Sequence, residues 1–209
     1  MSKQGVSYTD IKGSIVVALL FWFTPIYIAL LYTRPEPSIV NIIKTALLFI
    51  GVFSAMMLQH LLHRFTKASS NPLPVNPKHM ILSATVAFAC ALILSLLSTP
   101  LLWVWIILGV LTIFGYSLTR RVWYSNEILA GITWSTIFFG TYTLFTNNLL
   151  PSLNVLLLFV ALAGYYGLIV FVYRVITGDY GCPIPREVVN KLILQLFIST
   201  MILGLSIVV

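Results

Sequence analysis

Three polar segments interrupt an otherwise apolar chain, and they hold the residues whose types and spacing suit binding or catalysis. Each segment follows a long apolar run and combines aromatic, hydroxyl and charged side chains. The segments are Gln59-His60-Leu61-Leu62-His63-Arg64-Phe65-Thr66-Lys67, then Tyr116-Ser117-Leu118-Thr119-Arg120-Arg121, and then the stretch from Tyr173-Arg174 to Thr177-Gly178-Asp179.

His60 and His63 stand three residues apart, so they share one face if this segment is helical. The pair leaves three interpretations open. It contributes to a metal site, although two histidines without a nearby carboxylate or thiolate are a weak signal. Either imidazole ligates the magnesium of a chlorophyll-type pigment, or both lie at a helix end among lipid headgroups. The third interpretation is the simplest.

The basic residues allow a phosphate site or a membrane anchor. Arg120 and Arg121 could clamp a phosphate through paired hydrogen bonds. The simpler interpretation is an anchor beside anionic lipid headgroups, where each charge contributes about 1 kcal/mol. Candidate contacts to an anionic lipid or phosphate are Arg64, Lys67, Arg120, Arg121 and Arg174.

Asp179 is one of two aspartates in the chain and stands alone in a glycine-flanked turn. Such a carboxylate is more typical of a turn than of a metal site. The two cysteines, Cys90 and Cys182, have no metal-ligand spacing and are not expected to form a disulfide. The residues alone therefore identify no catalytic group and no metal site.

The composition of the chain predicts that membrane-spanning segments position these polar residues. The chain has 209 residues, of which 59% are hydrophobic and 8% charged, whereas a soluble domain has about 25% charged residues. A membrane-spanning helix needs about 20 mostly apolar residues. We therefore expect one membrane domain, residues 1–209, with about seven spans. The apolar runs cover residues 13–33, 38–59, 79–98, 100–119, 126–147, 152–175 and 190–209.

The spans are expected to be helices, because backbone groups in lipid must be paired within the segment and no alternating barrel pattern occurs. Proline, asparagine and glycine separate the runs, and the longest loop is predicted from Arg64 to Lys78. Gly164 and Gly167 would allow the sixth span to approach a neighbour closely. The predicted fold class is an all-α, polytopic transmembrane bundle.

Basic residues predict the orientation. Ten of the 12 basic residues fall on one side of the expected spans, with Arg34 and Lys44 on the other. The positive-inside rule then places the N-terminus in the cytoplasm and, with an odd number of spans, the C-terminus on the opposite side. The first run is expected to be a retained span rather than a cleaved signal. The positive charge, which lies beside span ends, favours anionic lipids over nucleic acid as the partner.

The order of the polar segments resembles that of the UbiA superfamily of intramembrane prenyltransferases, and in particular its chlorophyll and bacteriochlorophyll synthases. Gln59-His60-x-x-His63-x-x-x-Lys67 is in the register of the family's Asn-Asp-x-x-Asp-x-x-x-Asp. The loop that follows this motif in the family resembles Asn71-Pro72-Leu73-Pro74. The family's signature after span four resembles Tyr116-Ser117 with Arg120 and Arg121, and its second acidic motif resembles Thr177-Gly178-Asp179. The similarity covers essentially the whole chain.

The departures from the family bear on activity. The resemblance implies that two Asp-rich motifs hold magnesium on an isoprenoid diphosphate, and magnesium requires oxygen ligands. His60, His63 and Lys67 stand where the first motif has carboxylates, and Asp179 alone is too little. The chain also has fewer expected spans than the nine usual in the family. Both departures indicate a degenerate site, formed by Gln59, His60, His63, Lys67 and Asp179, and favour a non-catalytic protein.

The resemblance implies a structural or accessory subunit of a larger membrane complex, with a photosynthetic reaction-centre or light-harvesting assembly as the first place to look. Other integral membrane subunits and anionic lipids are the expected partners. No cofactor is required, although a lipid, quinone, carotenoid or (bacterio)chlorophyll is a candidate filler. The alternatives are a divergent prenyltransferase or an isoprenoid-lipid or pigment-binding protein. A transporter ranks last, because the spans contain almost no charge.

Overall fold

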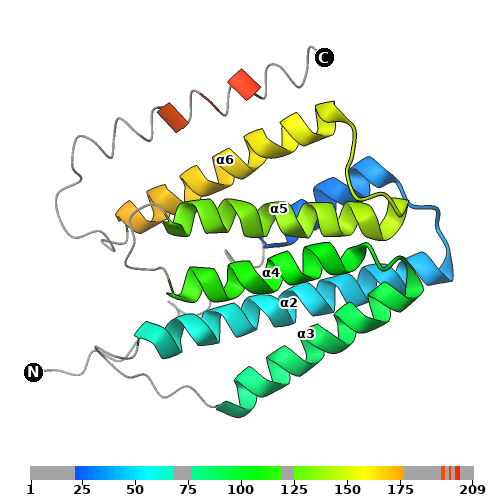
Figure 1. Ribbon diagram of the computed structural model, residues 1–209, viewed down its shortest axis with the longest axis horizontal. Coiled ribbons are helices and arrows are strands. Elements are labelled where there is room, and N and C mark those ends of the chain that lie inside the picture. The colour runs from blue at the N-terminus through cyan, green and yellow to red at the C-terminus, as the bar shows by residue number, and fades with distance from the viewer. Residues whose placement is uncertain are drawn as a thin grey trace, which may run out of the picture.

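The computed structural model describes residues 22–67, 77–118 and 125–176, together with positions 194, 195, 198, 201 and 202. These residues form helices and short connections without a strand among them, which confirms the all-α prediction for this part of the chain. The helices lie side by side in a bundle (Figure 1). Their bounds are Trp22–Thr33 for the first, then α2 Ile39–Lys67, α3 Pro77–Leu97, α4 Leu102–Leu118, α5 Ser125–Thr146 and α6 Leu153–Ile176.

Within the described ranges, three helices are long enough and apolar enough to cross a membrane, which makes this a membrane protein. Their spanning parts are Ile39–Gln59 of α2, Pro77–Leu97 of α3 and Ile128–Thr146 of α5. Three further apolar helices are shorter, namely Trp22–Thr33, Leu102–Tyr116 and Leu153–Leu168. The prediction of about seven spans therefore remains a prediction. Residues 13–21 of the first predicted span and most of the last predicted span lie outside the described residues.

Polar side chains and special residues define the helix ends. Arg34 closes the first helix in a left-handed conformation, with φ 42°, and its N–H donates to Leu30 O at 2.9 Å. Ser38 caps the start of α2, because its hydroxyl accepts the N–H of Asn41 at 3.2 Å. Pro77 begins α3, where its missing N–H costs nothing. Asn147 ends α5 with φ 57°.

The predicted start of the longest loop, at Arg64, is wrong by about one helical turn, whereas the apolar part of α2 ends at Gln59 as predicted. The helix does not stop at residue 59 but continues through Lys67, so the residues from Arg64 to Lys67, predicted as loop, are helical. Between Gln59 and Pro72 there is no glycine or proline, and leucine, arginine and lysine are all good helix formers. A helix that reaches the headgroup layer can continue there, because its charged side chains are solvated while its backbone remains paired.

The helices pack as two close pairs with α6 added at one side. α2 pairs with α3, α4 pairs with α5, and α2 contacts α4 to join the pairs. Glycines set two of the closest approaches. A Cβ built on Gly51 would lie 3.0 Å from Cys90 Cβ of α3, and one on Gly131 of α5 would lie 3.2 Å from Ala163 O of α6.

α5 forms the centre of the bundle. In its spanning part 56% of the residues are buried, against 17% in α2 and in α3. Aromatic rings fill the space between α5 and its neighbours: Phe159 of α6 lies 4.8 Å from Phe138 and 4.3 Å from Phe139, centroid to centroid. Ala29 of the first helix is completely buried in the same cluster. The core therefore joins the first helix to α5 and α6.

Candidate functional site

Gln59 is the one member of the predicted site whose side chain the structure describes in full. It lies on α2 at the end of the spanning part, and only 8% of it is exposed. Its amide oxygen Oε1 is buried and has no hydrogen-bond donor among the described residues. An unpaired buried acceptor costs about 1–3 kcal/mol. Gln59 is therefore the least satisfied polar group in the described part of the bundle.

The buried threonines of α5 differ from Gln59 in this respect. The hydroxyls of Thr133, Thr136 and Thr141 donate to the backbone carbonyls of Leu129, Ile132 and Ile137, one turn earlier, at 2.7–2.8 Å. Hydroxyls are short enough to bond within their own helix, whereas Gln59 Oε1 makes no such bond. The threonines need no partner from another element.

The histidine pair lies on one continuous helix. His60 and His63 both fall within α2, as do Arg64 and Lys67. The shared face expected for the two histidines therefore follows from the helix itself. The side chains of these four residues lie outside the described part of the structure.

The other predicted site residues are only partly placed. Arg174 lies in the last turn of α6, but its side chain is outside the described part, and Arg120, Arg121 and Asp179 fall outside it altogether. The ends of α2, α4 and α6 lie at the same end of the bundle (Figure 1). The three polar segments of the sequence therefore start at one end of the molecule. Contacts among their side chains stay a prediction.

Within the described ranges no three His, Cys, Asp or Glu side chains form a group suited to a metal ion. Cys90, buried between α3 and α2, is a free thiol. In the described part of the site, the only group that can take a ligand is thus a single neutral amide. Its chemistry is hydrogen bonding rather than acid–base or nucleophilic catalysis.

A second polar cluster lies at the C-terminal end of α5, at the end of the bundle opposite Gln59. It was not predicted from the sequence. Trp105 of α4 donates its indole N–H to Thr143 Oγ1, and Thr143 donates to Asn148 O, both at 2.9 Å. The hydroxyl of Ser98 donates to Leu144 O at 2.9 Å. The signal in the sequence was the unusual frequency of threonine within one apolar run. Every bond in this cluster is internal, so its role is to fix the helix ends.

Gly164 contacts the last apolar run of the chain. The amide of Gln195 donates to Gly164 O at 3.0 Å, while Gly131 of α5 approaches the neighbouring Ala163. Ala163 and Gly164 of α6 therefore lie against two different neighbours, and the approach of Gly131 to Ala163 is a close contact of the kind expected for this small-residue segment. Comparison of the whole chain with protein-family models, curated proteins and solved structures finds no match.

Proposed function

We propose that this protein is a non-catalytic relative of the intramembrane prenyltransferases that serves as a structural or accessory subunit of a larger membrane complex. The resemblance of the polar segments to the UbiA superfamily motivates the relationship, and the replaced carboxylates at His60, His63 and Lys67 motivate the loss of catalysis. A photosynthetic reaction-centre or light-harvesting assembly is the first complex in which to search.

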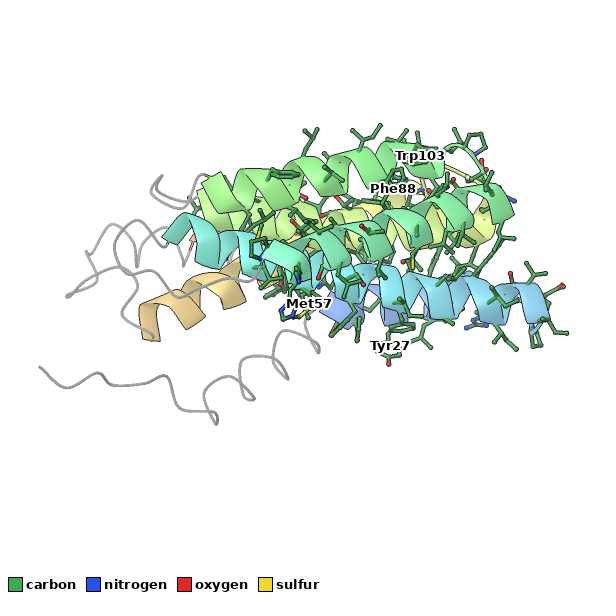
Figure 2. The ribbon with its side chains drawn as sticks, turned by 90° about the horizontal axis from the view of Figure 1, so that it is seen from below. Tyr27, Met57, Phe88 and Trp103 are labelled. Atoms are coloured by element: carbon green, nitrogen blue, oxygen red, sulfur yellow. The ribbon has the colours of Figure 1, made fainter. Side chains whose placement is uncertain are left out.

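The observation that carries the subunit role is the position of α3 at the edge of the bundle. α3 packs along α2 but touches α4 only slightly. Figure 2 shows Phe88 of α3 and Trp103 of α4 on the same flank, and their ring centroids are 6.3 Å apart. Further large apolar side chains of α3 are exposed: Ile81, Leu82, Leu92, Ile93 and Leu96. This flank offers a wide apolar surface to a neighbouring membrane helix.

Site-specific crosslinking in native membranes tests the subunit role. A photoreactive amino acid at Leu96, which is 78% exposed, should crosslink to a discrete second membrane protein. The same amino acid at Leu94, two residues away but only 5% exposed, should crosslink only within the chain. Mild detergent extraction should then recover the same partner in fixed proportion. If position 96 yields lipid adducts alone and the extracted protein is a monomer, the proposal fails.

The alternative is a protein that binds an isoprenoid lipid or pigment, or that retains prenyltransferase activity. The unpaired amide of Gln59 favours the ligand-binding form of this alternative, because a buried acceptor is suited to a donor from outside the chain. The catalytic form predicts release of diphosphate from an isoprenoid donor, with loss of release after Asp179→Asn or on chelation of magnesium. Absence of turnover across a panel of donors and acceptors would remove the catalytic form.

A further inference from the structure

Gln59 is a polar residue where packing alone would favour an apolar one. Its side chain is buried at the end of a stretch of 21 residues that is long and apolar enough to span a membrane. Because the amide oxygen is buried within the bundle, bulk water does not compensate for its missing partner. Leucine has a similar volume and would avoid the cost of the unpaired oxygen. A hydrogen-bond donor from outside the chain would account for the amide.

The chemistry of an amide oxygen restricts the class of ligand. It accepts hydrogen bonds and cannot donate them. Ionised phosphate groups, quinone carbonyls and pure hydrocarbons supply no donor, so none of them pairs with this atom. A divalent cation requires about six or more oxygen ligands, and Gln59 contributes one. A hydroxyl is a neutral group that fits, because it carries its own proton and tolerates a low-dielectric site.

Two methionines lie next to Gln59 along α2. Met56 is buried one turn before Gln59, so the two side chains share a face of α2. Met57 follows it and is partly exposed at the flank of the bundle (Figure 2). Consecutive residues point about 100° apart on a helix, so the pair extends from the interior toward the lipid side. Unbranched thioether side chains repack readily, which allows a slender chain to displace them.

We propose that Gln59 Oε1 accepts a hydrogen bond from the hydroxyl group of a neutral long-chain alcohol that enters the bundle laterally from the membrane. The hydroxyl pairs with the amide, and the alkyl chain lies along α2 beside Met56 and Met57. This site is independent of the subunit role, because it faces the interior of the bundle and not the α3 flank.

The experiment uses the full chain in lipid nanodiscs and two photoreactive probes. One probe is a long-chain alcohol with a diazirine next to its hydroxyl-bearing carbon, and the other is its methyl ether, which has the same alkyl chain but a methyl group in place of the donor hydrogen. The alcohol should label α2 around Gln59, and the ether should label it about five- to tenfold less, the value of one hydrogen bond. Excess unlabelled alcohol should compete.

Two variants complete the test. Gln59→Leu removes the acceptor and should reduce labelling by the alcohol to the level of the ether. Thr136→Val removes a buried hydroxyl whose bond is internal to α5, and it should label like the unmodified protein. Equal labelling by alcohol and ether, or unchanged labelling of Gln59→Leu, overturns the proposal.

Thermal unfolding separates binding from a structural role. Without probe, Gln59→Leu should melt at the same temperature as the unmodified protein or higher, because an unpaired acceptor has been removed. Saturating alcohol should raise the melting temperature of the unmodified protein but not that of Gln59→Leu. A lower melting temperature of Gln59→Leu without probe would reveal an internal partner for the amide and would also overturn the proposal. Neither result bears on crosslinking at Leu96.

Discussion

Trp105 and Thr143 join α4 to α5 through a hydrogen bond of 2.9 Å from the indole N–H to the threonine hydroxyl. The same hydroxyl donates to Asn148 O, so one fully buried threonine connects two helices and the turn that follows α5. In lipid each of these groups would otherwise be costly to leave unpaired. The relationship fixes the end of the bundle opposite Gln59.

Replacement of Thr143 by valine should therefore destabilise the protein. Thr143→Val keeps the shape but leaves the Trp105 N–H and the Asn148 carbonyl without their partner. The free energy of unfolding in detergent should fall by about 1–3 kcal/mol. The matched control is Thr136→Val, where only a bond to the preceding turn is lost. Its free energy of unfolding should fall by well below about 1 kcal/mol, the typical value of a single hydrogen bond. Equal losses in the two variants would contradict this assignment.

Gly51 should not tolerate a side chain. Its closest neighbour is Cys90 Cβ, 3.0 Å from an ideal Cβ at position 51, whereas carbon atoms prefer separations of about 3.5–4.0 Å. Gly51→Ala should cost about 1–3 kcal/mol by separating α2 from α3, and Gly51→Leu should cost more. Unfolding in graded detergent mixtures measures the loss.

Two controls make the Gly51 prediction specific. Gly115→Ala places its Cβ 3.5 Å from the Leu129 methyl groups, an ordinary contact, and should be neutral or stabilising by up to about 1 kcal/mol. In the Gly51→Ala background, Cys90→Gly should restore part of the stability, whereas Cys90→Ala should not, because it retains the Cβ. Equal rescue by glycine and alanine would mean that the sulfur, not the Cβ, is in conflict.

Phe159 should be the most sensitive aromatic position of the core. It is 2% exposed and contacts Trp134, Phe138 and Phe139. Phe159→Ala would leave a cavity at the centre of the bundle and should cost about 3–5 kcal/mol. Val160→Ala, at a neighbouring position that is 46% exposed, should change stability by less than about 1 kcal/mol. Similar losses at both positions would indicate that α6 is rotated relative to this structure.

Much of the helical pattern could be predicted from the sequence, because lipid permits few backbone conformations and the breaks have a clear chemistry. The Thr99-Pro100 break and Asn147 mark helix ends in both the sequence and the structure. The extension of α2 through Lys67 was missed because a charged segment was taken for a loop. Charge indicates where the apolar layer ends, whereas a helix ends where its backbone can no longer pair.

The buried faces could not be predicted. α3 and α5 are apolar all around, so nothing in their composition distinguishes the core from the lipid side. The structure resolves this for α5, where Trp134 and Phe138 face the core while Ile128 is exposed. At the candidate site the sequence identified Gln59 by its register, but its burial and unpaired oxygen depend on neighbours that are distant along the chain.

The orientation remains a prediction from the basic residues, and cysteine labelling checks it. In a background with Cys90→Ala and Cys182→Ser, Glu36→Cys should react with an impermeant maleimide added outside intact cells. Lys78→Cys, at the other end of the bundle, should react only after permeabilisation. Both native residues are exposed, so access is not limited by packing. The reverse pattern would place the N-terminus outside the cytoplasm.

The short turns at one end of the bundle limit what can approach the protein there. Residues 34–38, 98–101 and 147–152 connect the helices at that end, and all three turns lie close to the bundle (Figure 1). Ser38 accepts the N–H of Asn41 at the start of α2, and the N–H of Asn147 donates to Thr143 O at the end of α5. Antibodies and proteases would find few free loops on that surface. Affinity tags and reporter domains are therefore better fused at a chain terminus than inserted into these turns.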